Sequence, residues 1–103
     1  MYIYNVSIKL LPEIETEWIL WMKNEHMKDV LDTGMFDGYS LFELMDPVDE
    51  EGKTYIAQYL TDSEVRYKRY IEEFAPLLRE KGYEKFGNRF IAFRSIMRQI
   101  SSV

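Results

Sequence analysis

The stretch that decides the fold is residues 2–32, YIYNVSIKLLPEIETEWILWMKNEHMKDVLD, where the spacing of apolar side chains changes once. From Tyr2 to Leu10 every second residue is apolar or aromatic, which is the period of a half-buried β-strand. Pro12 then suits the first turn of a helix, because its missing N–H is not needed there. The pattern predicts a strand over residues 2–10, followed by a helix that runs to about Asp32 and stops at Gly34.

The remainder of the chain adds strand, strand, helix and strand in that order. We predict strands over residues 35–45 and 54–60, joined by an acidic loop. Thr61 and Glu64 have the spacing of a capping box, so a second helix is expected to begin there. Its apolar stripe comprises Tyr67, Tyr70, Ile71, Phe74, Leu77 and Leu78.

Pro76 lies inside that stripe, and we expect a kink or a restart there because proline cannot donate to the preceding turn. The helical stretch is expected to end at Gly82, or in a short extra turn up to Gly87, before a last strand over residues 89–100. The order β-α-β-β-α-β is typical of a ferredoxin-like sandwich. This α+β fold has a four-stranded antiparallel sheet with two helices on one face.

Composition sets further limits. The 103 residues suit a single domain, residues 1–103, with 47% hydrophobic residues to build its core. The net charge of −5 argues against a nucleic-acid surface and against an anionic membrane. Disulfides are excluded because there is no cysteine, and no stretch approaches the ~20 apolar residues of a membrane span. The first residues alternate like a strand rather than a signal peptide, so we expect a cytoplasmic protein.

The helices of this fold cover only one face of the sheet. Residues 35–45 and 89–100 nevertheless carry apolar side chains on both faces, and aromatic residues make up 16% of the chain. A bare apolar face is unfavourable in water, by ~25 cal/mol for each Å². We therefore predict a homodimer through the open sheet face and the last strand, with residues 97–103 reaching the partner.

The motifs YNV, EWILWMKNEH, YIEEFAPLLREKGYEKFG and FIAFRSIM, spread over nearly the whole chain, resemble a small bacterial family of uncharacterised proteins, a domain of unknown function. The resemblance implies a dimeric α/β barrel of the antibiotic-biosynthesis-monooxygenase type. Some haem-degrading relatives of that type place an Asn on the first strand and a Trp and a His on the second helix. Asn5 matches the first of these, whereas both tryptophans and the histidine lie on the first predicted helix here. The resemblance therefore implies a fold and no activity.

That first helix carries the most distinctive side chains. On an ideal helix Trp18, Met22, His26 and Val30 share one arc, with His26 near its middle and Trp21 at its edge. The tryptophans are expected to be core anchors. His26 has two interpretations, a hydrogen-bonded residue at the edge of the core or a base, acid or ligand in a pocket. We expect no metal site, because neither residue four positions away from His26 is a metal ligand.

Three further residues complete the candidate pocket. Asn5 either hydrogen-bonds with Gln58 or water at the dimer face, or forms the polar floor of a cavity. Arg94 stands among apolar residues of the last strand, and it either pairs with an acid across the dimer or binds an anion. Tyr59 either fills the core or walls a cavity.

Two functions remain open on these grounds. The first is a homodimeric small-molecule binder or enzyme, with no cofactor and a pocket between the first helix and the sheet. Its candidate residues are His26, Trp18, Trp21, Asn5, Tyr59 and Arg94. The alternative is a non-catalytic dimeric module for assembly or regulation, because no recognised set of catalytic residues is present.

Overall fold

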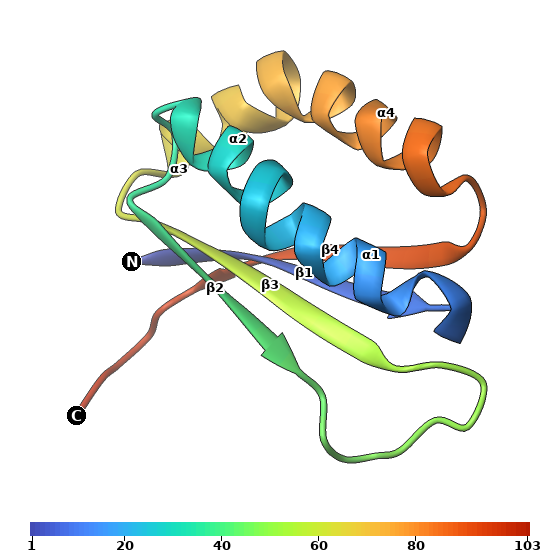
Figure 1. Ribbon diagram of the computed structural model, residues 1–103. Coiled ribbons are helices and arrows are strands. Elements are labelled where there is room, and N and C mark those ends of the chain that lie inside the picture. Colours follow the sequence, from blue (N-terminus) through green and yellow to red (C-terminus); the bar gives the residue numbers. More distant parts are fainter.

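A computed structural model describes all 103 residues and confirms the ferredoxin-like sandwich. The strands are Tyr2–Leu10 (β1), Gly38–Glu43 (β2), Thr54–Thr61 (β3) and Phe90–Arg98 (β4), in the antiparallel order β2-β3-β1-β4. The helices are Glu15–Trp21 (α1), Met27–Asp32 (α2), Glu64–Arg69 (α3) and Ala75–Phe86 (α4). All four helices cover one face of the sheet (Figure 1). No helix is long and apolar enough to cross a membrane.

The first helical segment is not a uniform α-helix. A 3-10 turn, Pro12–Ile14, precedes α1, and a π-helical turn, Met22–His26, joins α1 to α2. The π-helical turn adds a residue to one turn, so the buried positions after Met22 shift by one. Met27, only 1% exposed, therefore takes the core position that an ideal helix would give to His26, and His26 is displaced to a half-buried place beside Trp21.

The second helical segment differs from the prediction at its start. The residue that caps α3 is Ser63, whose side-chain oxygen accepts a hydrogen bond from the backbone N–H of Arg66 at 3.2 Å. The expected cap, Thr61, is the last residue of β3 instead. Its side chain is fully buried and accepts a hydrogen bond from the N–H of Ser63.

The predicted interruption at Pro76 is confirmed. A π-helical turn, Tyr70–Phe74, ends directly before α4, which has the proline in its first turn. This wide turn shifts the buried side of the helix, so Leu77 is 68% exposed rather than part of the apolar stripe. Helix α4 then continues through Gly82, which is buried inside it, and ends at Phe86.

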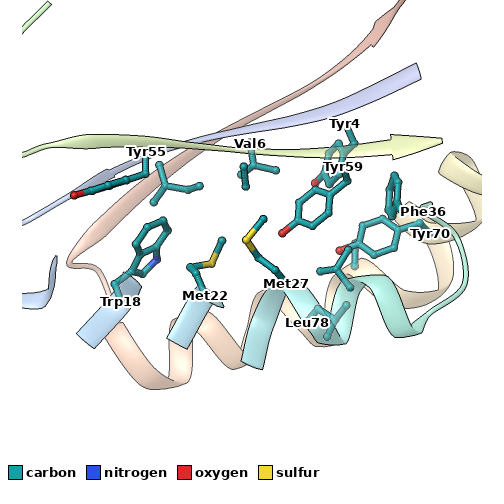
Figure 2. Packing of buried hydrophobic residues seen from close by; sticks show 14 of the residues in the cluster. Tyr4, Val6, Trp18, Met22, Met27, Phe36, Tyr55, Tyr59, Tyr70 and Leu78 are labelled. Atoms are coloured by element: carbon teal, nitrogen blue, oxygen red, sulfur yellow. The ribbon is translucent and has the colours of Figure 1, made fainter. Parts of the chain in front are cut away.

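The core fills the space between the sheet and the helices. Trp18, Met22 and Met27 point from the helices toward Val6 and Tyr59 on the sheet (Figure 2). One end of this core is a cluster of aromatic rings that comprises Tyr4, Phe36, Tyr59, Tyr67 and Tyr70, with neighbouring ring centroids 4.9–6.0 Å apart. Phe36 belongs to the turn before β2, which is shorter than the predicted strand over residues 35–45.

The other face of the sheet has no helix over it. A row of polar side chains crosses all four strands there in register, Ser40, Gln58, Asn5 and Ser95. Large apolar side chains lie on this face on both sides of the row, namely Ile3, Phe42, Ile56, Leu60, Ile91, Phe93 and Met97. Residues 99–103 follow β4 and lead away from the helices (Figure 1).

Candidate functional site

A cavity of about 60 Å³, partly open to solvent, lies between the helices and the sheet. It exists because small side chains occupy the middle of its walls. Ala57 on β3 and Ala92 on β4 form part of the sheet wall, and Gly82 lines the cavity from α4. A Cβ atom at Gly82 would lie 3.4 Å from the Trp21 ring, so the glycine and the indole are close neighbours in this wall. Trp18, Trp21 and Met22 supply the remaining apolar wall from the first helical segment.

The π-helical turn Met22–His26 places His26 in the wall of this cavity. Its ring stacks on that of Trp21, with centroids 4.6 Å apart and an angle of 23° between the planes. Its Nδ1 atom is buried and has no hydrogen-bond partner. Burial lowers the pKa of His26 to about 4; Asp29 opposes this shift, and the charges of Arg94 and Lys81 add to it. The imidazole is therefore neutral at pH 7 and has a free polar atom.

Two arginines line the same cavity. The Nη2 atom of Arg79 donates a hydrogen bond to the Tyr4 hydroxyl at 3.0 Å, while its Nε is buried without a partner. Arg94 lies on the helix-facing side of β4, opposite Val6 of β1. Neither guanidinium forms an ion pair, although ten ion pairs are present elsewhere in the chain. No Asp or Glu is among the lining residues, so the cavity is positively charged.

Buried tyrosine hydroxyls complete the polar part of the lining. Burial raises the pKa of Tyr59 and of Tyr70 well above the ordinary value, and neighbouring tyrosines act in the same direction. Both phenols are therefore protonated at neutral pH and can donate or accept hydrogen bonds. No group of three or more His, Asp or Glu side chains comes together in a way that could hold a metal ion.

The structure brings together five of the six residues that the sequence indicated. His26, Trp18, Trp21, Tyr59 and Arg94 all line the cavity.

Asn5 does not line the cavity, because it lies on the open face of the sheet. Its Oδ1 accepts a hydrogen bond from Gln58 Nε2 at 3.1 Å, which confirms the pairing considered for these two residues. Arg94 faces the helices rather than the open face of the sheet, and its pairing with an acid across the dimer stays a prediction.

Sequence reasoning missed Arg79, Tyr70 and Gly82. A signal for the arginine was present, because Arg79 follows Ala75 by four residues and precedes Gly82 by three, and both of these are buried. Residues with this spacing share one side of a helix. This spacing was overlooked because the apolar stripe of the second helix was extended from Tyr70 at a constant helical period, which does not place Arg79 on the buried side.

Several solved structures share the fold at very low sequence identity. A dimeric ferredoxin-like protein from an uncultured marine organism has a TM-score of 0.71 and 6% identity, covering 99% of this chain and 97% of that one. An ethyl tert-butyl ether d (EthD) family protein from Bacillus halodurans has a TM-score of 0.67 and 11% identity, with coverages of 97% and 100%. SnoaB, a cofactor-independent oxygenase from Streptomyces nogalater, has a TM-score of 0.59 and 9% identity, with coverages of 99% and 96%. These similarities show a shared fold and do not transfer an activity.

No curated protein matches the chain in sequence. One family model does, and its match extends over residues 1–100 of the 103. The family is described as a domain of unknown function, in agreement with the resemblance found from the sequence motifs. The chain therefore belongs to the DUF4286 family.

Proposed function

We propose that this protein is a homodimer in which each subunit binds a small molecule in the cavity between the helices and the sheet. The observation that carries the proposal is the set of unpartnered polar atoms, His26 Nδ1 and Arg79 Nε, in a cavity with mostly apolar walls. Buried polar groups in native proteins nearly always have a partner, so orphaned ones require an explanation. An apolar cavity with a few converging polar groups is the usual form of a ligand site.

The proposal is for binding rather than for a reaction. His26 Nδ1 has no hydrogen-bond partner, and the cavity lining contains no serine, threonine or cysteine that the imidazole could activate as a nucleophile. The second π-helical turn supports a ligand site, because it places Tyr70 in the same cavity that the first one lines with Met22 and His26. Such turns inside α-helices are frequent at functional sites. A cytoplasmic location remains a prediction from the sequence.

Thermal denaturation in the presence of a metabolite panel tests the site. A ligand that binds only the folded state raises Tm, by an amount equivalent to about 2.7 kcal/mol at a hundredfold excess over Kd. We expect this rise to disappear in His26→Ala and to persist in Lys23→Ala, whose exposed side chain lies in the same helical turn but outside the cavity. A ligand that stabilises both variants equally would place binding elsewhere and contradict the proposal.

The second part of the proposal is the dimer, with the open sheet face as its interface. Phe93 is 70% exposed there and Phe42 is 49% exposed, although burying one such side chain is worth about 1.5–3 kcal/mol. The polar row that contains Asn5 and Gln58 supplies hydrogen-bonding groups in the centre of this apolar face. Dimeric ferredoxin-like proteins of the same fold support the assignment.

Light scattering after size-exclusion chromatography tests this interface. We expect a dimer for the unmodified chain and a monomer for Phe93→Glu, because the substitution puts a charge into an apolar contact. Leu77→Glu is the matched control, since Leu77 is equally exposed but lies on the outer side of α4. A monomeric unmodified protein, or a Phe93→Glu variant that remains dimeric, would refute the open-face dimer.

A further inference from the structure

We infer that the molecule bound in the cavity is a small organic acid whose carboxylate is held by Arg79 and Arg94. This inference rests on the proposed binding function and adds the chemical class of the ligand. Three observations lead to it: the charge inside the cavity, the inability of arginine to lose that charge, and the apolar nature of the remaining wall.

The first observation is a local reversal of charge. The whole chain carries a net charge of −5, with eighteen acidic residues. Other arginines form ion pairs with these acidic residues: Arg66 and Arg69 both pair with carboxylates, at N–O distances of 2.8–3.0 Å. Arg79 and Arg94 meet none, and the cavity they share has no acidic side chain in its lining. The cavity therefore has two positive charges that the protein itself does not balance.

The second observation concerns protonation. His26 lines the same cavity and is neutral at pH 7, because burial lowers its pKa to about 4. A guanidinium has no such route, since it remains charged at any accessible pH. Both arginines are half-buried beside apolar side chains, where an unpaired charge is less favourable than at the open surface and a counter-charge is stabilising. A carboxylate supplies that charge and matches the planar, forked geometry of arginine with two parallel hydrogen bonds.

The third observation concerns the size and shape of the ligand. The cavity volume of about 60 Å³ is several times the roughly 10–15 Å³ that one water molecule needs, but below the ~300 Å³ of a pocket for a drug-sized molecule. Beyond the arginines the wall includes the aromatic side chains of Trp18, Trp21 and Phe90. These features favour a compact acid with a short apolar or aromatic part that extends toward the open side of the cavity.

Calorimetry at constant ionic strength, with matched acids and amides, tests the inference. The probes are acetate, propanoate and benzoate, and the neutral control is benzamide, which has nearly the shape of benzoate. A Kd near 1 mM, about −4 kcal/mol, is reasonable for benzoate with its nine non-hydrogen atoms. We expect affinity to rise from acetate to benzoate, and benzamide to bind at least about tenfold more weakly than benzoate.

Substitution of Arg94 gives the second measurement. We expect Arg94→Met to weaken benzoate binding by at least about tenfold, since hydrogen bonds to a charged group are worth about 1.5–3 kcal/mol. We also expect Arg94→Met to raise the Tm of the ligand-free protein, because the variant removes an unbalanced charge from a largely apolar place. Arg98→Met is the matched control, because Arg98 lies on the same side of β4 but is exposed and outside the cavity.

The outcomes separate this inference from the proposed function. Equal binding of benzoate and benzamide, abolished by His26→Ala, would refute the acidic ligand and leave the binding site intact. The inference is also overturned if Arg94→Met lowers the Tm of the ligand-free protein, because the arginine would then have a structural role. Absence of binding by every probe, together with no response to the metabolite panel, would refute both.

Discussion

The buried imidazole of His26 makes a specific prediction about stability and pH. Its pKa is about 4 in the folded protein and 6.5 in the unfolded chain. Between these values the unfolded chain binds more protons than the folded one, so stability falls as the pH is lowered through this range. Integrating the proton uptake gives a loss of about 2 kcal/mol between pH 7 and pH 5, and of about 3 kcal/mol by pH 4.

The measurement is the free energy of unfolding from urea titrations at several pH values between 7 and 5, for the unmodified chain and for His26→Gln. Glutamine does not titrate, so the variant is expected to lack this part of the pH dependence. The variant also loses the stacking on Trp21, about 0.5–1.5 kcal/mol, but that loss is independent of pH. The difference between the two proteins is therefore expected to change by about 2 kcal/mol in favour of the variant at pH 5.

Asp37 and Asp49 interfere little in this pH range. The pKa values of Asp37 and Asp49 are lowered by hydrogen bonds from Arg66 and Lys9, so their contributions are lost only at more acidic pH. If His26→Gln and the unmodified chain showed the same slope between pH 7 and 5, the imidazole would be solvated. The account of His26 as a neutral group in the cavity wall would then be wrong.

Three further substitutions test local features of the fold by thermal or chemical denaturation. Gly52→Ala should destabilise the protein by about 2–3 kcal/mol, because its Cβ would lie 1.9 Å from the backbone oxygen of Leu10; a neutral effect would mean that this loop can move freely. Gly82→Ala should instead stabilise it by up to about 1 kcal/mol, since the new methyl group would be in ordinary contact with Trp21 inside a helix; a loss of stability would contradict the spacing. Ser63→Ala should cost about 1 kcal/mol through loss of the cap on α3, and an unchanged Tm would assign the cap to another residue.

The element order could be predicted from the sequence because the two apolar periods are distinct. Alternation over residues 2–10 and 54–60 identifies strands, and these agree with β1 and β3 to within a residue. The capping residue of α3 was missed because Thr61 and Ser63 are both good caps, and only the length of β3 decides between them. The open apolar face could be predicted from the alternation of side chains along the last strand. Phe93, for example, lies on the side of β4 that faces away from the helices.

The cavity was predicted less completely, for a physical reason. Sequence reasoning extended each helix at a constant 100° per residue, whereas both helical segments contain a π-helical turn. His26 was placed at the centre of the buried arc, where Met27 lies instead, and Leu77 was placed inside when it is exposed. A π-helical turn inserts one residue into the helix, so a constant period misplaces every side chain that follows it.

The π-helical turn Met22–His26 also bears on how a deletion would affect the fold. Deleting one residue from Met22–His26 would restore a regular α-helix without altering the strands or the register between them. The segment after the deletion would keep its orientation, because Met27 would then follow Met22 by four residues and stay on the same side of a regular helix. Loss of His26 itself would thus remove the imidazole from the cavity wall, while the rest of the scaffold stays as it is.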